Sequence, residues 1–329
     1  SEAQWATLTN NSRHPLHNRT IQGQYPPGSV FKILTALAAL EEGIVTPHTT
    51  VCCPGYYVYG RRTYRDWKPS GHGCVNLYQA LAQSCDIYFY QVGQELGVDR
   101  IARYARAFGL GQATGFAPQT EKRGLIPSTQ WKRQARGQPW YGGETLSVAI
   151  GQGYTLTTPL QVANLIATLA NGGTLYQPYV VLRQESVDGT ILQQTPPTVL
   201  RQLDLKPEHI AWVKQGLWGV VHDPKGTGKL ARHEQIAIAG KTGTAQVIRL
   251  SKHNTGRKFQ EQLPERLRDH AWFVAFAPME APQIAVVVMI EHAGKGGSNF
   301  AGVAKAIIQA YLNRYPVVAS PLNATRLVP

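Results

Sequence analysis

Apolar residues recur at helical spacing along most of the chain and give way to strand-like runs late in the sequence. Helices are predicted at Ser29–Glu42, Leu77–Leu96, Asp99–Phe108, Pro159–Asn171 and Glu208–Val221. In the fourth of these, Pro159 opens the helix and Gly172-Gly173 closes it. Residues 29–235 should therefore form a mainly helical lobe, preceded by an irregular arm over residues 1–28 that contains Asn and Pro.

Residues 236–329 have the pattern of a sheet lobe with a C-terminal helix. Strands are predicted at Ile236–Ile248, Trp272–Ala277 and Gln283–Glu291, and a helix at Ala301–Asn313. Pro278 and Pro282 lie between the last two strands, which should therefore pair as an antiparallel hairpin. The charged stretch Arg249–Arg268 has little periodicity and should be a loop, either a substrate gate or a solvated connector. We expect one α+β domain over residues 1–329.

Basic residues outnumber acidic ones, 33 against 20, and give the chain a net charge of +13. The surplus is spread over Arg61-Arg62, Lys132–Arg136 and Lys252–Arg268. Such a charge attracts nucleic acid, anionic lipid or an acidic polymer. Because no nucleic-acid motif is recognisable, we expect no nucleic acid and favour a bacterial envelope partner, with scattered solvated charge as the alternative. Neither a signal peptide nor an apolar run of bilayer length is recognisable.

Three short motifs with reactive side chains follow one another along the chain. They are Ser29-Val-Phe-Lys32, Ser84-Cys-Asp86 and Lys241-Thr-Gly-Thr244. Each alone is more often a solvated side chain or a turn, but their order and positions favour a serine acyltransferase. Ser29 opens a predicted helix, and Lys32 lies one turn later on the same face. A lysine held there can take the proton of the serine hydroxyl.

Lys32 can act as this base only when it is neutral, which requires desolvation or a neighbouring cation such as Lys241. Gly243 would let a substrate approach the predicted strand closely. Lys241, Thr242 and Thr244 offer a cation and two hydroxyls to a substrate carboxylate. The backbone N–H groups of Ser29 and Thr244 would form an oxyanion hole.

These motifs and their surroundings resemble the transpeptidase domain of class B penicillin-binding proteins, most closely the elongation-type D,D-transpeptidases called penicillin-binding protein 2. The stretches that carry the resemblance are Pro15–Arg19 before Tyr25–Ser29, Asp66-Trp67 before Gly71–Gly73, Ser84–Gln91, Gly151–Tyr154 before Thr158–Gln161, and Leu267–His270 before Trp272–Pro278. They run through most of the chain. Asp86 stands where many relatives carry asparagine, which favours the elongation enzyme over the division enzyme.

The resemblance implies a penicillin-binding, serine β-lactamase-like fold, in which an antiparallel sheet is flanked by helices beside an all-helical lobe. In this family the first two strands of the sheet, a membrane anchor and a pedestal usually precede the nucleophile. Residues 1–28 do not plainly supply these strands, so the sheet is expected to be incomplete and the anchor and pedestal absent. The implied location is the bacterial inner membrane, with the catalytic domain in the periplasm and this chain a soluble fragment.

The implied reaction cross-links peptidoglycan stem peptides through an acyl-enzyme on Ser29, which β-lactams would block. By the same resemblance, Ser84 would carry protons and Asp86 would hydrogen-bond nearby groups or the substrate. No cofactor would take part in catalysis. The expected partners of the full-length protein are a membrane glycan polymerase and scaffold proteins of the elongation machinery.

Two other functions use the same motifs. A serine β-lactamase would hydrolyse the acyl-enzyme quickly, but the Glu-x-x-Leu-Asn segment of the class A enzymes is absent from this sequence. A penicillin sensor would be acylated without a biosynthetic role, and the elongation-type stretches disfavour it. Repeated hydrolysis of penicillin would identify the first, and failure to cross-link stem peptides would identify the second.

All four cysteines lie between Cys52 and Cys85. Cys53, Asp66, His72 and Cys85 offer two thiolates, a carboxylate and an imidazole, a set that tetrahedral zinc accepts, with Cys52 and Cys74 as alternates. Elongation-type enzymes carry similar residues at matching positions, so the resemblance supports a structural zinc. The alternatives are one or two disulfides, or Cys85 as a buried apolar residue. Because Cys85 lies within the second motif, a metal there would fix that motif.

Overall fold

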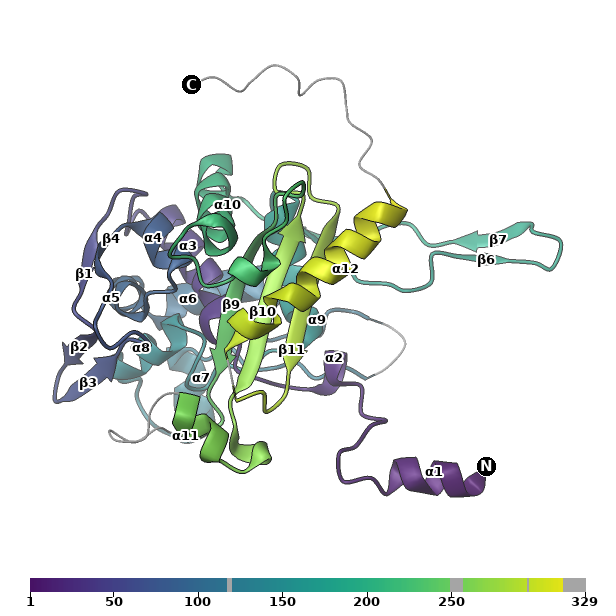
Figure 1. The fold of residues 1–329 in the computed structure, drawn as a ribbon, viewed down its shortest axis with the longest axis horizontal. Helices are drawn as coiled ribbons and strands as arrows, with labels where there is room; N and C mark the ends of the chain where they lie inside the picture. Colours follow the sequence, from purple (N-terminus) through teal and green to yellow (C-terminus); the bar gives the residue numbers. More distant parts are fainter. Residues whose placement is uncertain (117–119, 249–256, 295, 316–329) are drawn as a thin grey trace, which may run out of the picture.

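A three-stranded antiparallel sheet lies at the centre of the molecule, with its strands in the order β11 (Ile284–Ile290), β10 (His270–Ala277) and β9 (Ala239–Ala245) (Figure 1). The computed structural model describes residues 1–116, 120–248, 257–294 and 296–315. Every residue of β10 is buried, because both faces of the sheet are covered. Trp272, Val274 and Phe276 pack into the larger core with the helical lobe, whereas Phe273, Ala275 and Ala277 pack against α12 (Ala301–Arg314).

The helical lobe surrounds α3 (Lys32–Glu41), which is buried from Lys32 to Leu40. The other helices before the sheet are α1 (Glu2–Thr9), α2 (Arg19–Gln22), α4 (Leu77–Ala82), α5 (Asp86–Leu96), α6 (Val98–Ala107), α7 (Thr129–Arg136), α8 (Gly142–Ala149), α9 (Pro159–Ala170) and α10 (Pro207–His222). The short helix α11 (Arg257–Gln262) follows β9, and 3₁₀ turns occupy Gly28–Phe31 (η1), Lys229–Ala231 (η2), Glu265–Leu267 (η3) and Gly297–Phe300 (η4). No described helix has both the length and the apolar content that crossing a bilayer requires.

Small two-stranded sheets also belong to the helical lobe. The pairs are β1 (Val51–Cys53) with β4 (Gly73–Val75), β2 (Tyr56–Tyr59) with β3 (Arg62–Arg65), β5 (Thr174–Tyr176) with β8 (Val199–Gln202), and β6 (Arg183–Glu185) with β7 (Ile191–Gln194). All are antiparallel. The β6–β7 hairpin projects away from the body of the molecule (Figure 1). Mixed helices and antiparallel sheets make this an α+β fold, as the sequence predicted.

Most predicted elements are confirmed within a few residues. The helices predicted at Ser29–Glu42, Asp99–Phe108, Pro159–Asn171, Glu208–Val221 and Ala301–Asn313 are present, and the last two strands pair as the expected hairpin. Thr158 and Gln161 form a reciprocal capping box at the start of α9.

Other expectations were wrong. The single helix predicted over Leu77–Leu96 is two helices, α4 and α5, with a break at the second motif. Residues 1–28, expected to be irregular, contain α1 and α2, and none of them joins the β9–β11 sheet. The loop predicted at Arg249–Arg268 contains α11 and η3, and its residues 249–256 lie outside the described part of the chain. The sequence analysis also missed α7 and α8.

Candidate active site

The first motif begins in the 3₁₀ turn η1, which places Ser29 against the edge of β9. Gly28 has a φ of +55°, and a Cβ atom there would lie 2.3 Å from the carbonyl oxygen of Thr244. Only glycine permits this approach. The N–H of Gly28 also donates to the carbonyl of Gly151 at 3.0 Å. Ser29 is therefore held, partly exposed, where the third motif meets the helical lobe.

Lys32 joins the first motif to the second. It is fully buried, and its Nζ donates to the carbonyl oxygen of Ser84 at 2.8 Å and to Asp86 Oδ1 at 2.6 Å. Ser84 Oγ lies 3.3 Å from the same nitrogen. A buried ammonium requires such partners, because its desolvation is otherwise costly. The structure thus brings together Lys32, Ser84 and Asp86, three residues that the sequence analysis assigned to catalysis.

The second motif sits in a backbone break that the apolar pattern did not reveal. Ser84 has a φ of 57°, a left-handed conformation that costs a serine roughly 1 kcal/mol. Cys85 then returns to an extended conformation and starts α5. Asp66 Oδ2 accepts hydrogen bonds from the backbone N–H groups of Asp86, at 2.8 Å, and Ile87, at 3.3 Å. These bonds come from a segment about twenty residues earlier, so tertiary contacts override the local helical preference.

Trp67 also stabilises the break between α4 and α5. Its backbone N–H donates to Asp86 Oδ2 at 3.0 Å, and its indole Nε1–H donates to the carbonyl of Ser84 at 3.1 Å. Asp86 is therefore fixed through both oxygens, one on Trp67 and the other on Lys32. The bracing roles of Asp66 and Trp67 were missed by sequence reasoning, although both residues belong to a stretch that carries the family resemblance.

Lys241 of the third motif provides a second buried amine. Burial, reinforced by the positive charge of Lys32, holds the pKa of Lys241 well below its usual range, and the negative charge of Asp86 only partly opposes this. Lys241 Nζ donates to the carbonyl of Thr242 at 3.2 Å. Two buried lysines thus lie near one another in the same site, and the pKa of one of them, Lys241, is lowered.

The register of β9 separates the other residues of the third motif onto two faces. Lys241 and Gly243 lie opposite Val274 and Trp272, on the face that meets the helical lobe. Thr242 and Thr244 project from the other face. The hydroxyl of Thr242 is paired with that of Thr227 at 2.8 Å. The N–H of Thr227 in turn donates to the carbonyl of Ala82 at 3.3 Å, so Thr242, which was assigned to substrate binding, is linked through Thr227 to the segment just before Ser84.

The open edge of β9 faces the nucleophile turn. The carbonyl oxygen of Thr244 points away from β10, because it accepts a hydrogen bond from Gln152 Nε2 at 2.9 Å. In an antiparallel strand the N–H and C=O of one residue point to the same side, so the N–H of Thr244 also faces Ser29. Gln152 was not identified as a site residue from the sequence.

The four residues assigned to a metal do converge. Cys53 Sγ lies 3.4 Å from Asp66 Oδ2 and 3.5 Å from His72 Nδ1, and His72 Nδ1 lies 3.4 Å from Asp66 Oδ1. With Cys85 Sγ, the candidate ligand atoms all lie within 4.8 Å of one another. Zinc bonds of about 2.0–2.3 Å at tetrahedral angles give ligand separations of about 3.4–3.8 Å. The donor set and its spacing therefore fit zinc.

Cys52 and Cys74 form a disulfide between directly opposed residues of β1 and β4. The disulfide alternative is therefore confirmed for this one pair, and Cys52 and Cys74 are not alternates for a metal. Cys53 and Cys85 are free and buried, and burial raises the pKa of both thiols. A metal binding there would displace their protons.

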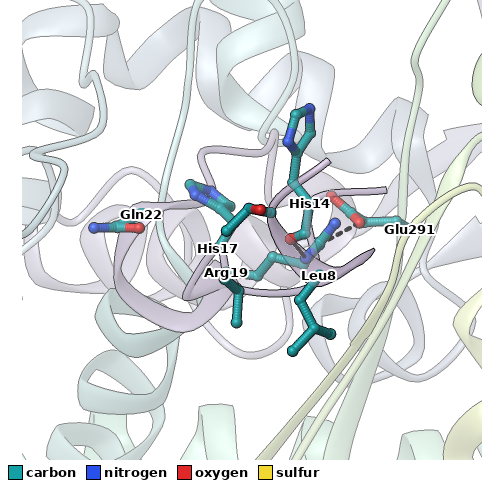
Figure 2. A pocket seen from close by; sticks show the side chains of 8 residues that line it. Leu8, His14, His17, Arg19, Gln22 and Glu291 are labelled. Carbon is teal, nitrogen blue, oxygen red and sulfur yellow. Dashed lines mark hydrogen bonds and ion pairs between the residues drawn. The ribbon is translucent and has the colours of Figure 1, made fainter. Parts of the chain in front are cut away.

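A separate pocket of about 600 Å³ lies between the N-terminal arm and the end of β11 (Figure 2). Figure 2 shows Arg19 pointing toward Glu291, with which it forms an ion pair at 2.6 Å. Tyr25 donates to the other oxygen of Glu291 at 2.7 Å. No residue of the three motifs lines this pocket, so it plays no part in the candidate chemistry.

Comparisons with known proteins agree on one family. The family model described as the penicillin binding protein transpeptidase domain matches residues 3–309. The chain is 39% identical to the peptidoglycan D,D-transpeptidase MrdA of Haemophilus influenzae over 322 residues, which cover 95% of this chain and 48% of that protein. The chain therefore spans about half the length of the curated relatives it matches.

Solved structures give the same result. The structure of Pseudomonas aeruginosa PBP2 in complex with WCK 5153 superposes with a TM-score of 0.81 at 38% identity, covering 95% of this chain and 64% of that one. The complex of PBP2 with MreC from Helicobacter pylori gives a TM-score of 0.82 at 33% identity, covering 96% and 54%.

Proposed function

The chain belongs to the penicillin-binding protein transpeptidase family, and from this premise we propose that it is a peptidoglycan D,D-transpeptidase of cell-wall elongation, acting through an acyl-enzyme on Ser29. The observation that carries the proposal is the cluster around Lys32 Nζ, which lies within hydrogen-bond distance of Ser84 and Asp86 one turn after Ser29. A nucleophile beside a positioned amine is the arrangement that acyl transfer requires.

Acylation uses the residues in the following order. Ser29 Oγ attacks the carbonyl of the penultimate D-alanine and gives its proton to neutral Lys32. The N–H groups of Ser29 and Thr244 stabilise the oxyanion. The bond to the terminal D-alanine breaks, and its amine leaves with a proton delivered from Lys32 through Ser84. An amine of a second stem peptide then attacks the acyl carbon. The bond to Ser29 Oγ breaks, a proton of the amine passes through Lys32 to Ser29 Oγ, and the cross-link forms.

Lys32 must first lose the proton that it shares with Asp86. The proposed acceptor is Lys241, which lies close enough for its pKa to be lowered by the charge of Lys32. A substrate carboxylate bound near Lys241 would favour this transfer, because it stabilises the positive charge that Lys241 gains. Lys32 is then neutral when Ser29 attacks, and β-lactams would react in the same way.

The proposal extends to location and partners. A relative from Helicobacter pylori is seen in complex with MreC, and the family resemblance implies a membrane glycan polymerase as well. The full-length protein is accordingly assigned to the bacterial inner membrane, with residues 1–329 as its periplasmic transpeptidase domain.

The test is the intact mass of the protein after brief and prolonged incubation with a penicillin. A persistent adduct of one drug molecule, absent from Ser29→Ala, supports the transpeptidase. A transient adduct with continued drug consumption supports a β-lactamase instead. Cross-linking of stem peptides, measured on the same preparation, separates the enzyme from a penicillin sensor, and absence of any adduct refutes the assignment of Ser29.

We also propose a structural zinc ion held by Cys53, Asp66, His72 and Cys85. The spacing of their ligand atoms supports it, and so does the buried position of both thiols. Zinc would supply folding energy here rather than chemistry. Because Asp66 also accepts the N–H groups that start α5, the ligand set and the second motif share one residue.

Metal analysis by mass spectrometry tests this second proposal. About one zinc per chain is expected, and it should be lost in Cys53→Ser but kept in the matched control Cys52→Ser, which breaks only the disulfide. Removal of zinc by a chelator should lower the thermal unfolding midpoint. Zinc-free protein in which Cys53 and Cys85 titrate as thiols would end the proposal.

A further inference from the structure

A cluster of aromatic rings is formed by residues of α7, of the segment before α8 and of the segment that follows α8. We call Trp131, Trp140, Tyr141 and Tyr154 the aromatic platform. The ring of Tyr154 lies 5.0 Å from that of Trp131 and 6.4 Å from that of Trp140. Tyr141 is 57% exposed, and the other three side chains are partly exposed. Half-exposed aromatic rings that are not needed to fill a core are typical of binding surfaces.

A buried ion pair holds these rings in place. Lys132 is only 1% exposed, and its Nζ donates to both carboxylate oxygens of Glu144 at 2.5 Å. The same nitrogen lies 4.3 Å from the ring centre of Tyr141 and 5.7 Å from that of Trp140. Cation–π attraction to Lys132 therefore holds the rings of Tyr141 and Trp140 in position. The platform is consequently pre-formed, which lowers the entropy lost on binding.

The platform shares a chain segment with the active site. Tyr154 follows Gln152, whose side chain donates to Thr244, and Gly151, whose carbonyl accepts from Gly28. The same short segment thus carries one ring of the platform and supports the nucleophile turn. A ligand that lies on the platform would extend toward Ser29.

The charge around the platform selects among ligands. Arg133 and Arg136 are exposed, and the guanidinium of Arg136 lies 6.0 Å from the ring centre of Tyr154. Aromatic faces accept the apolar C–H face of a sugar ring, while the surrounding polar groups stay hydrated. Exposed arginines add attraction for carboxylates.

We infer that the aromatic platform binds the glycan strand of uncross-linked peptidoglycan, with amino-sugar rings on the aromatic faces and carboxylates of the polymer near Arg136. This inference rests on the proposed function, because a cross-linking enzyme must bring a stem peptide that is attached to a glycan strand to Ser29. The platform would hold the polymer so that one stem peptide reaches Ser29. The three motifs account only for binding of the stem peptide. The platform adds a surface that binds the glycan polymer.

The test compares two matched double variants. Tyr141→Ala with Arg136→Ala removes one ring and one cation of the platform. Tyr315→Ala with Arg314→Ala removes an equivalent pair, in which the guanidinium lies 5.7 Å from an exposed ring, at the far end of α12. Three probes are used: soluble uncross-linked glycan strands with stem peptides, the same strands without stems, and the free pentapeptide.

The platform variant should bind both kinds of strand about tenfold more weakly, while its affinity for the free pentapeptide and that of the control variant for all probes stay unchanged. Unchanged strand affinity in the platform variant, or an equal loss in the control, would overturn the inference. A loss confined to pentapeptide-bearing probes would also overturn it, because the platform would then bind peptide. Penicillin acylation of the same preparations tests the proposed function separately, since strand binding requires no acylation.

Discussion

Two buried lysines of the helical lobe have nearly the same first partner and very different surroundings. Lys32 pairs with Asp86 at 2.6 Å, and Lys132 pairs with Glu144 at 2.5 Å. Both side chains are almost completely shielded from solvent. Lys32, however, lies beside a second amine, Lys241, and a strained serine, whereas Lys132 is enclosed by aromatic rings and holds both oxygens of its carboxylate.

The difference shows that a buried ion pair does not define a function by itself. In the proposed mechanism the proton of Lys32 passes to Lys241, whose pKa is held well below its usual range by burial, so that this amine can begin the reaction without a proton. Lys132 instead bonds both oxygens of Glu144 and lies against the rings of Tyr141 and Trp140, so this pair supports the rings. The groups around a buried ion pair therefore determine whether the pair takes part in catalysis or only stabilises the structure.

Substituting each lysine by arginine gives the largest expected contrast. Arginine keeps the charge but cannot give up its proton. The rate constant for acylation by penicillin should fall by about 10³-fold in Lys32→Arg, because a general base is lost. In Lys132→Arg it should stay within about threefold, because the pair with Glu144 survives. Stopped-flow acylation measures both, and normal acylation by Lys32→Arg would refute its role as base.

Two substitutions of Ser84 separate the effect of its hydroxyl on acylation from the effect of its backbone conformation on stability. Both Ser84→Ala and Ser84→Gly remove the hydroxyl, so acylation should fall by about 10² in each. Glycine also relieves the left-handed backbone at φ 57°, so this variant should be about 1 kcal/mol more stable than the alanine variant. Urea unfolding measures the difference. Equal stabilities would mean that the backbone at this position carries no strain.

The sequence predicted the chemistry of the Lys32 region better than its conformation. The order of the motifs identified Lys32, Ser84 and Asp86, which the structure brings together. The break between α4 and α5 could not be read from the chain, because the bonds that stabilise it come from Asp66. The pairing of the Thr242 hydroxyl with that of Thr227 likewise depends on the tertiary fold, because the two residues lie in different segments of the chain.

The Lys132 region was missed for a different physical reason. α7 contains only two apolar residues, Trp131 and Ala135, so its apolar pattern spans a single turn. Ser128 accepts from the N–H of Trp131 as an N-cap, and Gly137 ends the helix in a left-handed conformation. These caps were the available signal. Lys132 itself was counted only as part of the basic surplus, because nothing in the sequence brings it to Glu144.

Glu144→Gln tests whether Lys132 is indeed held as a cation. Glutamine can keep the hydrogen bond to the backbone N–H of Tyr141 but leaves the buried ammonium without a counter-charge. The free energy of unfolding should fall by about 2 kcal/mol, less than for a fully buried pair because Glu144 is partly exposed. The double variant Lys132→Met with Glu144→Gln should recover part of this loss. Equal destabilisation in the single and double variants would contradict the assignment.

His270 is a buried basic side chain that, unlike Lys32 and Lys132, has no ion pair with a carboxylate among the described residues. Its Nδ1 accepts the N–H of His292 at 2.9 Å, and burial, with the charge of His292, lowers its pKa to about 4 from 6.5, although Glu291 partly opposes this. Between these values the unfolded chain binds more protons than the folded one, so stability falls as the pH drops from about 6.5 toward 4.

The contribution of His270 to this loss should be about 1–2 kcal/mol. In His270→Gln, the unfolding free energy should therefore fall less between pH 7 and pH 4.5 than in the wild type, by that amount. Tyr25, whose pKa is raised above its usual value, does not titrate in this range, and Glu291 keeps its main partners, Tyr25 and Arg19, in both proteins. Parallel pH profiles would mean that His270 is protonated equally in the folded and unfolded chains, and that burial alone does not keep a base neutral in this sheet.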